Sequence, residues 1–299
     1  RSEFKTNTNI LIPSARTTEI SMLTILFNEN KFPKNILPIV RILGINYLSD
    51  LPKKILNSFI NLVNNKKIKL FSETEELATK IKAKYKVKFI KPLMFPVSVP
   101  LNYIPDKLIA NKSINIGCLG GPRPSKGTYL IPGLVKNLRK YIRENNEDIS
   151  ITFIVQMSKE KKKREFIFRI KEIMSRHISK LVRVKIVYGT DSRKDFMSLI
   201  NTVDIFLLPY KKKQYKYSGS GFIIDALLLE KPIIISEGIA MRELTNFKNS
   251  ITFKNALDFP EATVKLIKTY QNYSKNRQTA RKYLINKINN SFKYILEDI

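Results

Sequence analysis

The segment that decides the fold is residues 203–236, VDIFLLPYKKKQYKYSGSGFIIDALLLEKPIIIS. Its apolar residues 205–208 predict a short buried strand that stops at a proline. A basic, aromatic loop follows, and the turn Ser218-Gly219-Ser220-Gly221 then opens a helix that runs to about Glu230. The β-branched residues 233–235 predict a second strand. The order strand, loop, helix, strand indicates a unit of a parallel α/β sheet.

The Gly/Ser turn of this segment allows two interpretations. A flexible turn at a helix N-terminus presents free backbone N–H groups and the positive end of the helix dipole, and together these favour a phosphate group. An ordinary helix with a serine N-cap would carry the same residues. The turn alone leaves both interpretations open.

The same alternation of strands and helices extends in both directions along the chain. In the first half we expect strands at 8–13, 36–43, 67–71 and 87–95, and helices at 17–28, 51–64 and 72–85. In the second half we expect strands at 114–119, 149–156, 182–188, 205–208, 233–235 and 250–253, and helices at 129–145, from 156 to 179, at 192–201, at 221–230 and from 260 onward. Thr17 to Glu19 is expected to cap the first helix, and Ser72 and Glu75 have the spacing of a capping box. This alternation predicts the α/β class, with parallel sheets and crossover helices.

The boundary between the two halves is expected at residues 100–110, which carry two prolines and no strong periodicity. The prediction is therefore an N-terminal Rossmann-like domain over 1–106, a nucleotide-binding domain over 107–275, and a last helix over 276–299 that packs back toward the N-terminal domain. Ligands of Rossmann-like sheets bind beyond the carboxyl ends of the strands.

A second loop with phosphate-binding features follows the strand at 114–119. It reads Gly120-Gly121-Pro122-Arg123-Pro124-Ser125-Lys126-Gly127, where the glycines allow close approach of a ligand and Arg123 and Lys126 supply positive charge. It is neither G-x-G-x-x-G nor a P-loop, and by itself it could equally be a solvated turn. Because this loop and the 218–221 turn both follow strands of one parallel sheet, we expect them at the same edge, which strengthens the phosphate interpretation.

Six landmarks over residues 112–270 together resemble the donor domain of retaining GT-B glycosyltransferases, in particular glycosyltransferase family 4. They are the glycine loop ending in Lys126-Gly127, the strand ITFIV, the strand end VKIVYG at Gly189, the segment VDIFLLP, the turn at Gly221 with Asp225-Ala226, and Lys231-Pro232-Ile233. The resemblance implies a GT-B architecture, in which two Rossmann-like domains with parallel sheets face each other across a cleft.

The resemblance also implies roles for single residues. Lys126 matches the lysine that holds the donor diphosphate, and Asp225 matches the second acidic residue of the E-x7-E motif, which contacts the ribose. A carboxylate in the first turn of a helix, favoured by the dipole, is the alternative for Asp225. Lys126 and Asp225 are the candidate catalytic residues. The candidate donor-binding residues are Gly120, Gly121, Arg123, Lys126, Gly189, Tyr210, Ser218, Gly219, Ser220, Gly221 and Asp225.

The chain also departs from the family pattern. Tyr217 stands where E-x7-E has its first Glu, Gly121 stands where an Arg is usual, and Asp225 replaces a Glu. The usual histidine of the N-terminal domain is missing, and the single histidine, His177, is expected at the surface or in packing. The first two βα units of that domain have no counterpart, and the chain begins at Arg1 instead of Met. We expect a truncated N-terminal domain; a naturally short one is the alternative.

These features predict an enzyme that moves a sugar from a nucleotide-diphosphate sugar to a saccharide or lipid-linked acceptor in cell-surface glycan synthesis, with retention. No cofactor and no metal are expected, because the sequence has no D-x-D and no His/Cys set with ligand spacing. Alternatives are a sugar-nucleotide-binding pseudoenzyme, suggested by Tyr217, or a nucleic-acid-binding protein, for which no motif is visible.

The charge of the chain bears on its partners and location. There are 54 basic and 25 acidic residues, a net charge of +29, and one cysteine, which is typical of a reducing compartment. Clusters such as 159–164 and 211–213 would attract anionic lipid headgroups or the phosphates of the donor; a lysine-rich background composition and a solvated loop are the alternatives. We expect a cytoplasmic protein at the inner face of the cytoplasmic membrane and no specific nucleic-acid partner.

Overall fold

The computed structural model describes residues 8–96, 98–105, 113–157, 181–189, 192–270 and 273–296. The chain divides into two compact units. The first comprises Arg1–Phe95, Lys216–Gly219 and Asn286–Ile299, and the second comprises Pro96–Tyr215 and Ser220–Ile285. The boundary between the units first falls after Phe95. The domain bounds expected from the sequence stay a prediction.

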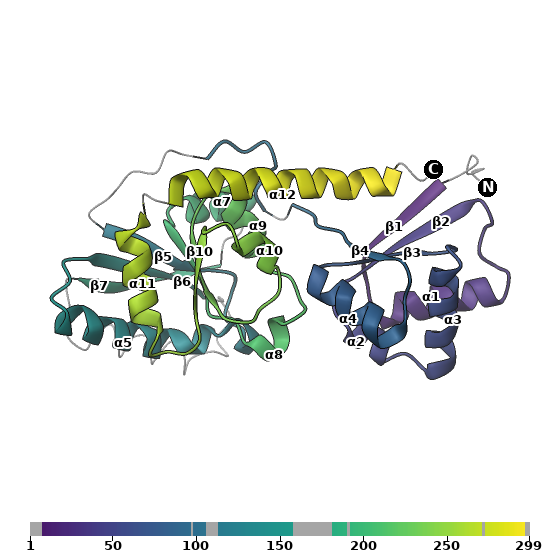
Figure 1. Ribbon diagram of the computed structural model, residues 1–299, viewed down its shortest axis with the longest axis horizontal. Helices are drawn as coiled ribbons and strands as arrows, with labels where there is room; N and C mark the ends of the chain where they lie inside the picture. The colour runs from purple at the N-terminus through teal and green to yellow at the C-terminus, as the bar shows by residue number, and fades with distance from the viewer. Residues whose placement is uncertain are drawn as a thin grey trace. The chain divides into compact units, whose positions relative to one another are not determined.

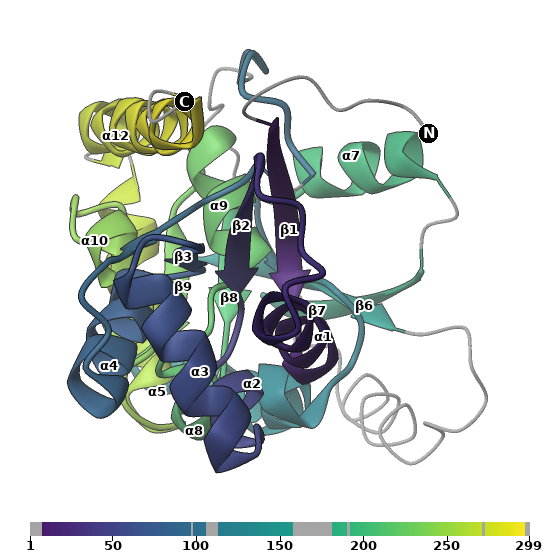
Figure 2. The same ribbon diagram turned by 90° about the vertical axis from the view of Figure 1, so that its right-hand side faces the viewer.

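The first unit contains a four-stranded parallel sheet in the order β1-β2-β3-β4. Its strands are β1 (Thr8–Ala15), β2 (Ile36–Ile42), β3 (Lys69–Ser72) and β4 (Ile90–Pro92). Its helices are α1 (Thr17–Asn28), α2 (Asn46–Ser49), α3 (Lys53–Asn64) and α4 (Glu75–Tyr85). Because each strand lies beside the one before it, right-handed crossovers place the helices on one face of the sheet, as Figures 1 and 2 show for α1, α3 and α4.

The opposite face of this sheet carries a smaller apolar cluster. Ile39, Phe71 and Leu93 are buried there together with Ile295, near the end of the chain, and Phe95 packs against them. The last turns of α12 (Tyr273–Leu296) therefore contribute to the core of the first unit, while residues up to 285 belong to the second. The larger cluster, on the helix side, includes the fully buried Phe59 of α3.

Two helix starts in the first unit correct the sequence-based prediction. Ser72 is not a helix cap, because it pairs with Ile42 as the last residue of β3 and its hydroxyl donates to the carbonyl of Thr74. Thr74 is the N-cap of α4, and its Oγ1 accepts from the N–H of Leu77 at 3.1 Å. The helix expected from residue 51 begins only at Lys53.

The second unit contains a six-stranded sheet in the order β10-β9-β8-β5-β6-β7, with all pairs parallel. Its strands are β5 (Ser113–Cys118), β6 (Ser150–Met157), β7 (Val182–Tyr188), β8 (Ile205–Leu208), β9 (Ile233–Ser236) and β10 (Ser250–Phe253). The chain starts in the middle, moves outward to β7, and returns to the other side of β5. The point of reversal therefore lies between β5 and β8.

Helices cover both faces of this second sheet. They are α5 (Ile131–Glu144), α7 (Arg193–Asn201), α8 (Lys212–Tyr215), α9 (Gly221–Leu228), α10 (Arg242–Thr245) and α11 (Phe259–Lys268). Figure 1 shows α5 on one side of the sheet and α7 and α9 on the other. The strands are accordingly buried along their whole length in the centre, for example all four residues of β8.

Most of the expected elements are present, with differences at their ends. The six strands of the second half are confirmed, whereas the extended segment at 87–95 contributes only the three residues Ile90–Pro92 to a sheet. The sequence analysis missed the four-residue helices α2, α8 and α10. The basic helix expected up to residue 179, with the 159–164 cluster and His177, lies outside the described residues.

Within the part of the chain that the structure describes, no helix is both long enough and apolar enough to cross a membrane.

Candidate functional site

The candidate site of the second unit lies where the strand order reverses. In open α/β sheets ligands bind at this point, beyond the carboxyl ends of the two strands that flank the reversal. Here those strands are β5 and β8, and the Gly120–Gly127 loop follows β5 while the loop toward the Ser218–Gly221 turn follows β8. The two segments chosen from the sequence thus leave the sheet from neighbouring strands.

Two contacts hold the segments after β5 and β8 together. The N–H of Lys211 donates to the carbonyl of Ser125 at 2.9 Å. Gly127 has a φ of 65°, and a Cβ there would collide with the carbonyl oxygen of Pro209. Glycine is required at position 127 both for the left-handed backbone and for this close approach.

Gly120 and Lys126 form the tightest part of the loop. Gly120 has a φ of 93°, and a Cβ there would collide with the Phe222 ring and with the Lys126 ammonium group. The N–H of Gly120 donates to Oε1 of Gln156 at 2.7 Å, and Lys126 Nζ donates to the Gly120 carbonyl at 2.8 Å. The lysine near the end of the loop therefore binds the backbone at the start of the loop.

The side chain of Lys126, in the loop after β5, contacts the first turn of helix α9. Its Nζ is 5.0 Å from the centre of the ring of Phe222, the second residue of that helix. Burial lowers the pKa of Lys126, and the positive charge of Arg123 lowers it further. Arg123 itself is exposed, and Gly121, with a φ of 66°, faces open space. The charges of Lys126 and Arg123 and the first turn of α9 thus belong to one part of the unit. Positive side chains beside a helix N-terminus favour the binding of a phosphate.

Tyr210 supports the turn from inside the unit. It is buried, it stacks on Tyr215 with ring centres 4.1 Å apart, and its hydroxyl lies 2.9 Å from Oγ of Ser220. Burial raises the pKa of the Tyr210 phenol well above its usual range. Ser220 is the N-cap residue of α9, and its N–H donates to the sulfur of Met241 at 3.4 Å.

Asp225 is buried and bonded within the second unit. It is 1% exposed, and its Oδ1 accepts N–H groups from Ser98 and Val99, each at 3.0 Å. Burial raises its pKa, while these two hydrogen bonds and the charge of Arg193 act in the opposite direction. Asp225 is the fifth residue of α9, so the alternative of a first-turn carboxylate was wrong.

The other half of the turn, Ser218 and Gly219, belongs to the first unit. The N–H of Gly219 donates to Oε2 of Glu73 at 2.8 Å, and the carbonyl of Tyr217 accepts from the Thr74 hydroxyl at 2.6 Å. The Tyr217 side chain packs against the main core of that unit. Their predicted contact with a donor phosphate stays a prediction.

Glu73 is paired with Arg41 inside the first unit. Burial raises the pKa of Glu73, opposed by the Gly219 N–H and by Arg41, whose Nη2 lies 3.7 Å from Oε1. Arg41 also donates to the backbone carbonyls of Leu93 and Pro13, at 2.6 and 3.1 Å.

The remaining candidate, Gly189, is not brought beside the others. It follows β7, which is separated from β5 by β6, and a Cβ at this position would meet open space. The sequence analysis missed Gln156, Phe222 and Met241, because an amide in a strand, an aromatic ring in a helix and a thioether before a short helix carry no local signal of a site. In the described residues, no group of three or more His, Cys, Asp or Glu could hold a metal ion.

Comparisons by sequence give no relatives: no protein-family model matches, and no curated protein matches either. Comparisons by structure do. HepE from Anabaena, in complex with UDP and glucose, has a TM-score of 0.65 at 13% identity, covering 97% of this chain and 78% of HepE. WaaG, a glycosyltransferase involved in lipopolysaccharide biosynthesis, has a TM-score of 0.59 at 14% identity, covering 92% of this chain and 80% of WaaG. The chain has the GT-B fold.

TarM is similar to a comparable degree, with a TM-score of 0.61 at 16% identity and 91% of this chain covered. The chain spans 53% of the length of TarM. At identities this low, the similarity to these GT-B glycosyltransferases establishes the fold alone. The ligands found with those proteins are not thereby ligands of this chain.

Proposed function

We propose that this protein is a glycosyltransferase that binds a nucleotide-diphosphate sugar at the β5/β8 edge of the second unit. The observation that carries the proposal is that the two candidate segments leave the sheet at the point of strand reversal, where Lys126 Nζ lies 5.0 Å from the ring centre of Phe222 in the first turn of α9. A diphosphate is the ligand that a helix N-terminus, a lysine and an arginine would bind together. HepE, which has the same fold, was found with UDP and glucose.

In the proposed reaction the bond between the anomeric carbon and the donor phosphate oxygen breaks, an acceptor hydroxyl oxygen bonds to that carbon, and the hydroxyl proton passes to water. The nucleoside diphosphate leaves with an additional negative charge. Lys126, Arg123 and the first N–H groups of α9 would stabilise that charge, which lowers the barrier of the step. By resemblance to family 4, the anomeric configuration is retained and no metal takes part.

The test is calorimetry with UDP, GDP, ADP and CMP and their sugar conjugates. We expect one diphosphate to bind selectively and Lys126→Ala to weaken its binding at least tenfold, since one charge-assisted contact contributes about 1.5–3 kcal/mol. Lys136→Ala, which removes the same charge from an exposed position of α5, is the matched control and should bind like the unchanged protein. Absence of binding by folded protein to every nucleotide would overturn the proposal.

Tyr217 favours a second candidate, a pseudoenzyme that binds a sugar nucleotide without turnover. Its ring packs against the core of the first unit, at the position where the family motif has a carboxylate. Tight binding of one nucleotide-diphosphate sugar without transfer of its sugar, in the presence of a range of saccharide and lipid-linked acceptors, would favour this candidate. NMR of a transferred sugar would establish turnover and give the anomeric configuration.

We also propose that the acceptor is a saccharide or lipid-linked saccharide at the inner face of the cytoplasmic membrane. The net charge of +29 supports this, because each Lys or Arg near an anionic surface contributes about 1 kcal/mol. Sedimentation with anionic vesicles should therefore carry down the protein, and neutral vesicles should not. Equal binding to both vesicle types would contradict the proposal.

A further inference from the structure

Two hollows lie side by side at the amino-terminal edge of the sheet in the first unit. Their volumes are about 800 and 510 Å³, and they share Leu37 and Lys66 in their walls. The first residues of β1 and β2, Thr8 and Ile36, line one hollow, and the first residue of β3, Lys69, lines the other. They form one surface, the amino-edge groove, at the end of the sheet opposite to the carboxyl ends of the strands.

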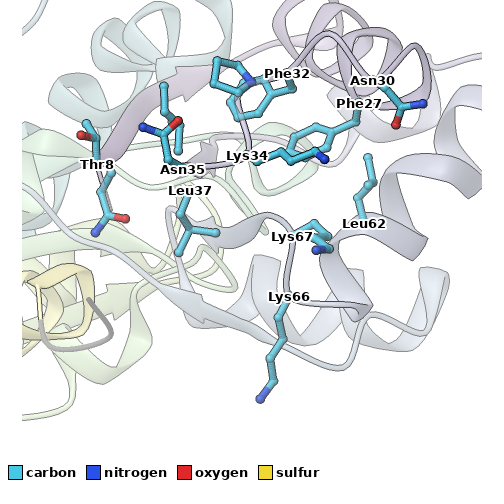
Figure 3. A pocket seen from close by; sticks show the side chains of 13 residues that line it. Thr8, Phe27, Asn30, Phe32, Lys34, Asn35, Leu37, Leu62, Lys66 and Lys67 are labelled. Atoms are coloured by element: carbon cyan, nitrogen blue, oxygen red, sulfur yellow. The ribbon is translucent and has the colours of Figure 1, made fainter. Parts of the chain in front are cut away.

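Lysines dominate the walls of the amino-edge groove. The first hollow is lined by Lys34, Lys66 and Lys67, and the second by Lys66, Lys69, Lys82, Lys88 and Lys91. No acidic residue lines either hollow among the residues that the structure describes. Figure 3 shows Lys66 extending away from the other labelled side chains of the first hollow, which agrees with its place in the wall of the second.

The groove also contains aromatic rings. In the first hollow Phe27 and Phe32 stack with ring centres 4.4 Å apart. In the second, Phe89 is 51% exposed beneath Lys66, whose Nζ is 5.3 Å from the ring centre. Tyr294 is 46% exposed, with Lys91 Nζ at 3.8 Å. These contacts place two ammonium groups over aromatic rings in the wall of the second hollow.

Charge is divided between the two edges of this sheet. Of the six acidic residues of the first unit that the structure describes, five follow the carboxyl ends of strands: Glu19, Asp50, Glu73, Glu75 and Glu76. The sixth, Glu29, is the C-cap residue of α1 at the amino edge, and it pairs with Lys31 at 2.7 Å. A lysine-rich composition alone would spread lysines over the surface without placing most of the acidic residues at the opposite edge.

The helix dipoles do not cancel this charge. The C-termini of α1, α3 and α4 point to the amino edge, and α12 ends two residues after Tyr294 in the groove wall, so these four C-termini contribute about −0.5 charge each, roughly −2 together. The seven lysines that line the groove contribute a larger positive charge. The groove is therefore positive overall and would attract an anion.

The length of the groove favours an extended ligand. It spans the starts of four parallel strands, and three spacings of about 4.8 Å give roughly 14 Å. A single phosphate would reach only a part of the lysines over that distance. We propose that the amino-edge groove binds an inorganic polyphosphate chain, at a site separate from the strand edge proposed for the sugar donor.

The test uses fluorescently labelled inorganic polyphosphate as the probe and anisotropy as the readout. The triple variant Lys34→Gln, Lys66→Gln and Lys67→Gln should bind at least tenfold more weakly than the unchanged protein. The slope of log affinity against log salt should become shallower by about 2, because each phosphate contact on a single chain contributes about 0.7. Binding of the nucleotide that the calorimetry selects should not change.

The matched control is the triple variant Lys53→Gln, Lys54→Gln and Lys80→Gln. It removes the same charge from exposed positions of the same unit outside the groove, and its polyphosphate affinity should change less than twofold. Lys66→Gly is a second test that is safe for folding, since Lys66 has a φ of 59°, where glycine is preferred. It should weaken polyphosphate binding with an equal or higher Tm.

Three outcomes would overturn the proposal. Equal loss of affinity in the two triple variants would mean that polyphosphate responds only to net charge. Loss of binding to anionic vesicles with unchanged polyphosphate binding would assign the groove to a membrane surface. A larger loss for a labelled single-stranded oligonucleotide than for polyphosphate would assign it to nucleic acid.

Discussion

The two sheets of this protein are built from the same βα unit but reach different results. In the second unit the strand order reverses between β5 and β8, so helices cover both faces, and the reversal is the edge at which we propose that the donor binds. In the first unit the order β1-β2-β3-β4 runs in one direction, so the crossover helices share one face. Ile295 of α12 helps to cover the other face. The connectivity decides which edge of each sheet can hold a ligand.

The largest expected effect compares a central strand with an edge strand. Leu207 of β8 is fully buried, whereas Leu11 of β1 is 37% exposed. Leu207→Ala should lower the free energy of unfolding by about 3 kcal/mol, because it leaves a cavity between covered faces. Leu11→Ala should lower the free energy of unfolding by less than about 1 kcal/mol. Urea denaturation of both variants checks this prediction. Equal losses in the free energy of unfolding would contradict the contrast between the central strand β8 and the edge strand β1.

The next effect sharpens the comparison at the ligand edge of the second unit. Gly127→Ala should lower the free energy of unfolding by about 2–3 kcal/mol, because it combines a left-handed backbone with a collision against the Pro209 carbonyl. It should also weaken nucleotide binding. Gly133→Ala places the same methyl group in open space on α5 and serves as the control. If both variants bind the nucleotide that the calorimetry selects equally well, the contact between the two segments does not shape the donor site.

The smallest effect concerns one buried carboxyl group in each unit. Burial raises the pKa of Glu73 and of Asp225 in the folded chain. Between the ordinary and the raised pKa the folded state holds more protons than the unfolded state, so stability falls as the pH rises through that interval. Glu73→Gln and Asp225→Asn should each flatten the fall in denaturation midpoint above about pH 4. An unchanged slope in both would show that neither carboxyl is linked to folding.

The fold class could be predicted because buried parallel strands are continuous apolar runs, as in residues 205–208 and 233–235, and because glycine turns separate them from helices. The position of the two candidate segments in the fold could be predicted because glycine turns follow the apolar runs at 114–119 and 205–208, although their contact with a donor stays a prediction. The helix start at Thr74 could not, since Ser72 and Thr74 carry equivalent hydroxyls and only the pairing of Ser72 with Ile42 excludes the first.

The sequence by itself determined the α/β class, the parallel strands of the second unit and the two candidate segments, because periodicity and turn chemistry are local. Only the tertiary structure decided what those residues contact. It placed Asp225 against Ser98 and Val99, gave the Gly219 N–H to Glu73, and put lysines from separate segments, such as Lys34 and Lys66, on one groove. Such contacts join residues far apart in the chain, and they depend on the order in which strands pair, which no local pattern encodes.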